Sequence, residues 1–162
     1  MRSTLWRAML DADFNSRYWS DITQKYIQRD FVLKIALAVS ASGSVAGWAI
    51  WGEWPLAWKI LSGASALASI ASPLLAYGKK VETAAGHAGL WADLRIRYDD
   101  LWELYQSKGE SEPLRREHAR LRKIFLQLEV KEPKLKIPKD QKLARKVQQE
   151  VLVARELKGA PS

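Results

Sequence analysis

The chain has 162 residues, with 26 Lys or Arg against 18 Asp or Glu, and a formal net charge of +8 at pH 7. It contains no cysteine, which excludes disulfides, zinc–thiolate sites, thiol catalysis and lipid attached to cysteine. Its mean hydropathy is only −0.26 because long charged segments surround a markedly apolar middle.

The first 30 residues predict a helix from about Asn15, where Asn15 or Ser16 can serve as the N-cap. Five apolar residues fall on one side of that helix: Phe14, Tyr18, Trp19, Ile22 and Tyr26. We interpret this segment as a cytoplasmic extension that packs on its neighbours.

Two apolar stretches follow, Phe31–Trp51 and Pro55–Tyr77, 21 and 23 residues long, on either side of a break at Gly52–Pro55. About 20 apolar residues in a helix cross the roughly 30 Å hydrocarbon core of a bilayer, and so short a break forces the two helices antiparallel. The sequence therefore predicts an all-α membrane protein, in which a two-span transmembrane helical hairpin over 31–78 precedes a cytoplasmic helical bundle or coiled-coil region. The alternative is that both stretches form the buried core of an all-α bundle.

Aromatic and charged residues around these stretches predict an orientation. Four tryptophans gather at the break, as at a membrane–water interface: Trp48, Trp51, Trp54 and Trp58. Arg29, Lys79 and Lys80 flank the opposite ends, whereas the turn itself carries only Glu53. By the positive-inside rule we expect a multi-pass protein of the cell inner membrane with both termini cytoplasmic.

Small and hydroxyl-bearing residues share faces of the two stretches. They are Ser40, Ser44 and Gly47 on the first and Ser62, Ser65, Ser69 and Ser72 on the second. Small residues let two helix backbones approach closely, whereas hydroxyl stripes in an oligomer can line a wet pathway. These residues are therefore candidates for pore lining or for packing within the hairpin.

Residues 79–130 predict an antiparallel pair of helices with coiled-coil-like seams, joined by a loop around Gly109. The candidate oligomerisation seam consists of Trp91, Leu94, Tyr98, Leu101, Tyr105, Leu121, Phe125 and Leu128. His87, Leu114 and His118 continue the same helical spacing but are not counted in the candidate seam. Two or three heptads for each helix suit a compact bundle, closed by the N-terminal helix or by neighbouring subunits.

The tail, 131–162, begins as an extended linker with Pro133 and Pro138 and continues as an amphipathic helix with a basic face over Asp140–Leu157. Its Lys and Arg could attract anionic lipid or nucleic-acid phosphates. No aromatic residue interleaves them, so lipid association or a solvated arm is the better interpretation, and direct nucleic-acid binding is not expected.

No enzyme is predicted, and no catalytic, cofactor-binding or metal site is assigned. His87 and His118, the two histidines, fall about 20 Å apart when the helices fold back at Gly109, so one subunit cannot bring both to a single metal. Each is interpreted as a packed, hydrogen-bonded histidine of its seam.

The layout resembles the SLATT-type two-transmembrane effectors of bacterial anti-phage and conflict systems. The residues that carry the resemblance lie within about 14–128: Arg17 and Tyr18, the two apolar stretches, Lys79 and Lys80, and the helix through Trp91, Tyr98 and Trp102. It implies an effector that oligomerises, forms a pore or disrupts the inner membrane, and causes growth arrest or cell death.

The resemblance also implies a trigger, either a nucleotide signal or an operon-encoded sensor such as a nucleotide cyclase or retron components. No sensor domain is recognised in this chain. The expected partners are the lipid bilayer and further copies of the chain. Two alternatives are a phage holin-like membrane protein and a non-toxic membrane anchor that recruits a cytoplasmic partner.

Overall fold

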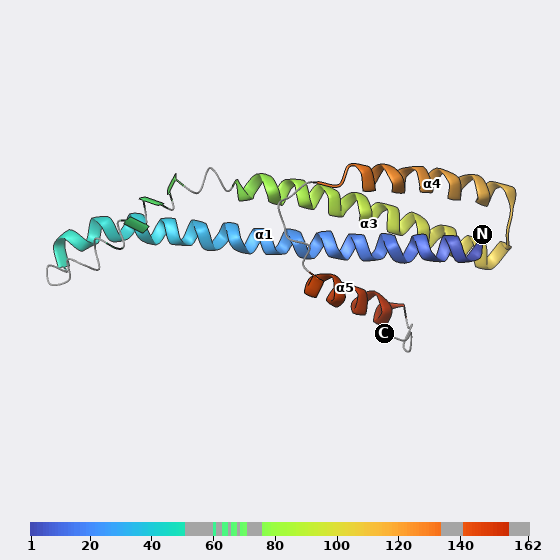
Figure 1. Cartoon of the computed structure of the whole chain (residues 1–162), viewed down its shortest axis with the longest axis horizontal. Helices are drawn as coiled ribbons and strands as arrows, with labels where there is room; N and C mark the ends of the chain where they lie inside the picture. The colour runs from blue at the N-terminus through green and yellow to red at the C-terminus, as the bar shows by residue number, and fades with distance from the viewer. Residues whose placement is uncertain are drawn as a thin grey trace. The chain divides into compact units, whose positions relative to one another are not determined.

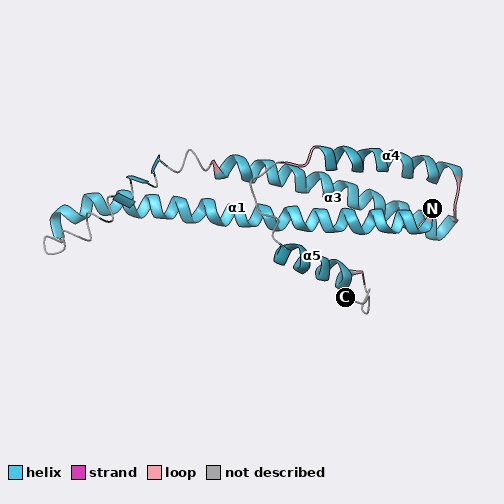
Figure 2. Cartoon of the chain, viewed as in Figure 1, coloured by secondary structure: helices cyan, strands magenta, loops and turns pink. Residues whose placement is uncertain are grey.

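The computed structural model describes residues 1–50, 60, 63–64, 66–67, 69–70, 76–133 and 141–155, with side chains from 1 to 39 in the first range. All regular structure in these residues is helical (Figures 1 and 2). The helices are α1 (Arg2–Ile50), α3 (Tyr77–Lys108), α4 (Glu112–Val130) and α5 (Gln141–Ala154). The expectation of an all-helical chain therefore holds for this part of the sequence.

The chain divides into two compact units. Unit 1 combines Met1–Thr23 with Thr83–Ser162, and unit 2 is Gln24–Glu82. Because α1 runs from Arg2 to Ile50, its first part belongs to unit 1 and its remainder to unit 2.

The core of unit 1 lies where α3 packs between α1 and α4 (Figure 1). The Trp6 ring lies 5.0 Å from that of Trp102, which joins α1 to α3. The Trp91 ring lies 5.2 Å from that of Phe125, which joins α3 to α4. Aromatic pairs at these separations contribute beyond the apolar area that they bury.

The turn between α3 and α4 has the chemistry that such a connection needs. Gly109 adopts φ +72°, a left-handed conformation that glycine accepts without steric cost and that commonly ends a helix. Pro113 stands in the first turn of α4, where its missing N–H is not needed. The chain thus reverses within a few residues and sets the two seams face to face.

The helix α5 packs against α1 in unit 1 through a narrow aliphatic stripe. Leu143, Val147 and Val151 recur every four residues and are all buried, whereas Val153 on another face is 62% exposed. Isolated helices of this length are marginal in water, so packing of this stripe is what stabilises α5.

The predicted two-span transmembrane hairpin is wrong. Across the residues that the structure describes, no helix combines the length and the apolar character needed to cross a membrane. The first apolar stretch is the continuation of the polar helix that begins at Arg2, and its described side chains end at Val39. Within that part Lys34 forms an ion pair with Asp30, so the described run falls well short of about 20 apolar residues.

The multi-pass inner-membrane location was inferred from the hairpin and is wrong with it. Most of the second stretch, Pro55–Tyr77, lies outside the described residues, as do the break at Gly52–Pro55 and the side chains of the clustered tryptophans. The predicted location depends on the hydropathy of both stretches taken whole. In the structure, the first stretch continues a charged helix that begins at Arg2.

The packing of unit 1 predicts that Leu121→Ala will lower the free energy of unfolding by about 2–5 kcal/mol, because Leu121 is fully buried and its truncation leaves a cavity. Leu126→Ala on the same helix is the matched control, since Leu126 is 51% exposed and should change stability by no more than about 0.5 kcal/mol. Urea unfolding followed by circular dichroism measures both. Equal losses would contradict the described packing of α4.

Candidate functional site

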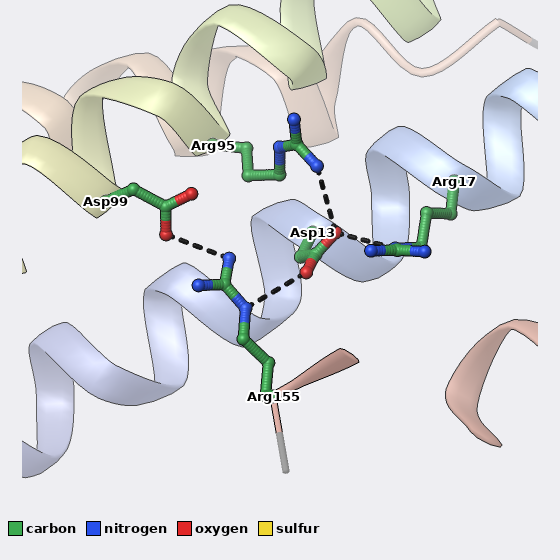
Figure 3. Close-up of polar contacts among 5 residues, drawn as sticks. All are labelled: Asp13, Arg17, Arg95, Asp99 and Arg155. Carbon is green, nitrogen blue, oxygen red and sulfur yellow. Dashed lines mark hydrogen bonds and ion pairs between the residues drawn. The ribbon is translucent and has the colours of Figure 1, made fainter. Parts of the chain in front are cut away.

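A buried carboxylate forms the centre of a polar cluster in unit 1 (Figure 3). Asp13, on α1, has a side chain that is 1% exposed. Arg17, one turn further along α1, donates from Nε to Asp13 Oδ1 at 2.8 Å. Arg155, directly after α5, donates from Nε to Asp13 Oδ2 at 3.1 Å, and Arg95 of α3 places Nη1 3.5 Å from Asp13 Oδ1.

These contacts keep Asp13 ionised. Burial works to raise the pKa of its carboxyl, but hydrogen bonds and charge from Arg17 and Arg155 outweigh it, so that the pKa lies below its ordinary value of 3.8. A buried charge is tolerated when it is paired and hydrogen-bonded. Three arginines from separate parts of the chain therefore converge on one anion.

A second carboxylate extends the cluster. Arg155 Nη2 lies 2.8 Å from Asp99 Oδ1, although Asp99 Oδ1 makes no hydrogen bond of acceptable geometry. We treat this contact as an ion pair, because attraction between charges depends little on angle. With three arginines and two aspartates the cluster carries a formal charge of +1. Its contacts join α1, α3 and the end of α5.

A more exposed pair holds the other end of α5. Lys146 donates from Nζ to Asp21 Oδ2 on α1 at 3.0 Å and lies 3.4 Å from Glu150 Oε1 on its own helix. Hydrogen bonding to Asp21 is the main cause that raises the pKa of Lys146. Exposed pairs of this kind contribute little to stability, so the buried stripe and the Asp13 cluster are the main contacts of α5 in unit 1.

His87 sits in an aromatic cage within unit 1. Trp91 Nε1 donates to His87 Nε2 at 3.0 Å, and the Trp19 ring packs edge-on 4.8 Å away. An imidazole nitrogen that accepts a hydrogen bond is unprotonated. Burial lowers the pKa of His87, and burial also lowers that of His118, whose ring lies 6.4 Å from Tyr98.

The candidate seam residues lie inside the single chain. Tyr105 and Phe125 are half-buried. The other six are buried: Trp91, Leu94, Tyr98, Leu101, Leu121 and Leu128. Contacts between α1, α3 and α4 thus already cover much of this seam. Its role between copies of the chain stays a prediction.

The hydroxyl-bearing residues fall mostly where the structure says nothing of them. Ser62, Ser65 and Ser72 lie outside the described residues, and for Ser40, Ser44 and Gly47 in α1 only the helical backbone is described. Ser69 is described as helical and exposed. Their assignment to pore lining or hairpin packing is not tested by this structure.

A surface groove in unit 2 is a second candidate site. The α1 groove has a volume of about 660 Å³ and is lined by Lys25, Gln28, Arg29, Val32, Leu33, Ala36 and Tyr77. Tyr77 packs 6.1 Å from buried Tyr26 and carries Lys80 Nζ 5.3 Å above its ring, within cation–π range. Beside it α1 exposes Phe31, Val32 and Ile35 at 63%, 64% and 49%.

No protein-family model, curated protein or solved structure matches the chain. In the described parts of the sequence, no three histidine, aspartate or glutamate side chains gather as metal ligands would. The sequence analysis missed both the Asp13 cluster and the α1 groove. The only local signal for the cluster was the Asp13–Arg17 spacing of four residues, which is common on helix surfaces.

We expect Asp13→Asn to lower the free energy of unfolding by about 3 kcal/mol. Breaking a buried ion pair costs about 3–5 kcal/mol, and the lower end applies because Arg17, Arg95 and Arg155 remain 33%, 34% and 21% exposed. Asp21→Asn, the matched control, removes an exposed pair and should cost about 0–1 kcal/mol. Chemical denaturation of both variants measures the difference, and a loss at Asp13 no larger than at Asp21 would contradict the central role of the cluster.

The histidines predict that stability falls on mild acidification. Because the folded pKa values of His87 and His118 lie below the ordinary 6.5, the unfolded chain binds protons first. Their contribution is full above about pH 6.5 and declines as the pH falls below it. Asp13 acts in a lower window, below its ordinary 3.8.

His87→Gln keeps an acceptor for Trp91 but does not titrate, so the decline in thermal stability between pH 7 and pH 5 should become shallower. Adding His118→Gln should flatten it further. Calorimetry across this range checks the effect. An increase in stability on acidification, or an unchanged slope in the double variant, would contradict the assignment.

Proposed function

We propose that the protein is a non-enzymatic interaction module that binds an acidic amphipathic helix of a partner protein in the α1 groove. The observation that carries this proposal is a row of exposed apolar side chains with a cationic border. Phe31, Val32 and Ile35 leave an apolar strip on α1, and exposed strips of this kind are typical of protein interaction sites. A helix that presents apolar residues every three or four positions is a natural occupant.

The charges around the groove select the sign of the partner. Lys25 and Arg29 line it, and Lys80 stands over Tyr77 beside it. Acidic residues on the rim of a bound helix would meet these cations, which accelerates association and suppresses wrong partners. A second copy of this chain is a poorer occupant, because each copy carries +8 and the two would repel. The predicted homo-oligomer is therefore not the basis of this proposal.

The resemblance to SLATT-type effectors supplies a biological setting, a part in bacterial defence against phage in which the module receives or relays a partner's signal. This setting is supported by residue layout alone. The pore mechanism depended on the transmembrane hairpin and is not carried forward. What remains is part of the second alternative drawn from the sequence, the recruitment of a partner, without the membrane anchor.

The proposal predicts that a helical peptide with leucines along one face and glutamates beside them will bind the intact chain. Val32→Asp should weaken this binding at least about tenfold, which corresponds to about 1.4 kcal/mol of binding free energy. Val153→Asp is the matched control. Val153 is 62% exposed, close to the 64% of Val32, but it belongs to α5 in unit 1 and does not line the groove. Fluorescence anisotropy of the labelled peptide measures both.

Two further comparisons sharpen the test. A peptide with lysine in place of every glutamate should not bind, and added salt should weaken the acidic peptide because the rim charges are exposed. Equal binding of both peptides, or equal losses in the two valine variants, would refute the proposal. Light scattering of the unliganded chain that shows a dimer lost only in Val32→Asp would instead identify a second copy as the occupant. Phage challenge of bacteria that express each variant tests the defence setting separately.

A further inference from the structure

The helix α5 is held on unit 1 through a compact and self-contained set of contacts. Leu143, Val147 and Val151 supply the buried face. Lys146 binds Asp21 at 3.0 Å and Arg155 binds Asp13 at 3.1 Å. We call the surface that α5 covers the α5 seat, defined by Asp13, Asp21 and Asp99. Figure 3 shows its Asp13 end.

The seat and the helix are complementary in charge. Residues 141–155 contain four Lys or Arg and one Glu, a net charge of +3 (4 − 1). On the seat, Lys146 meets Asp21, and Arg155 meets Asp13 and Asp99. Arg17 and Arg95 also pair with Asp13, so these three aspartates and two arginines carry a net charge of −1 (2 − 3). The seat therefore binds a basic amphipathic helix, whose apolar stripe is flanked by cations. This chemistry is opposite in sign to that of the α1 groove, and the inference does not depend on the function proposed for that groove.

Nothing in these contacts requires that α5 come from the same chain. The connection from α4 to α5 spans residues 131–140, ten residues that include Pro133 and Pro138. Ten extended residues reach at most about 33–36 Å, and their effect is to raise the local concentration of α5 at the seat. Exchange of an identical element between copies creates the same contacts and is a low-cost route to a dimer.

We propose that the α5 seat also binds α5 of a second copy, so that two chains exchange their C-terminal helices and the partner's Arg155 pairs with Asp13. Each copy then completes the buried cluster of the other. The net repulsion between two chains is opposed locally, because residues 141–155, with a charge of +3, meet a seat whose three aspartates and two arginines carry −1. The exchanged state is favoured as protein concentration rises, since it forms in a bimolecular step.

The absence of native cysteine makes the exchange directly measurable. One full-length chain carries Asp21→Cys and another carries Lys146→Cys, the positions whose side chains meet at 3.0 Å. The two are mixed, incubated and treated with a short bismaleimide. A cross-linked dimer from the mixture, well above that from either variant alone, is the expected result, and a tenfold higher protein concentration should increase its fraction.

Two substitutions on α5 control for accidental collision. Val147→Asp, at a fully buried position, should abolish the cross-linked dimer because it removes α5 from the seat, whereas Val153→Asp, at a position 62% exposed, should leave it intact. A chain that carries both cysteines reports that the seat is formed, through an internal cross-link that speeds its migration on a denaturing gel. An internal cross-link without any dimer in the mixture overturns the proposal, as does a dimer that survives Val147→Asp.

Discussion

The structure of unit 1 depends on the pairing of one buried carboxylate. Asp13 lies on a helix that would otherwise present an apolar face to its neighbours, and its charge is acceptable only because arginines from α1, α3 and the end of α5 reach it. The requirement works in both directions. The Asp13 carboxylate is paired only when α1, α3 and α5 are correctly packed. Conversely, only the correct packing of these helices brings the three arginines to Asp13. A buried ion pair of this kind specifies an arrangement more than it adds net stability.

The helices α3, α4 and α5 could be predicted from the sequence because their signals are local. The expected start of the first helix near Asn15 is wrong, because α1 begins at Arg2 and the Asn15 side chain donates to Asp11 O within that helix. The 4-3-4-3 spacing through Trp91, Leu94 and Tyr98 describes one face of α3, and Gly109 marks the turn that follows. The transmembrane hairpin was predicted from apolar character summed over two long stretches. The hydropathy of a stretch does not show which helix it belongs to. Here the first stretch continues a charged helix, in which Asp30 forms an ion pair with Lys34.

The candidate sites could not be predicted because both are made by tertiary contacts. Asp13 and Arg155 are 142 residues apart, and neither stands in a motif. The α1 groove combines one helix with Tyr77, and Val32, which the sequence analysis counted as part of an apolar span, is exposed in the structure. In contrast, the packing of His87 was anticipated from its place on the seam, since His87 is buried and accepts a hydrogen bond from Trp91 Nε1.

The three partners of Asp13 become available at different times during synthesis. Arg17 lies one turn away and can pair as soon as the first helix forms. Arg95 can pair only once α3 has emerged, and Arg155 only once the longer stretch of chain through α5 has emerged. The cluster can therefore gain its arginines one after another, in the order in which they stand in the sequence, and Asp13 has a nearby cation from the first helix onward.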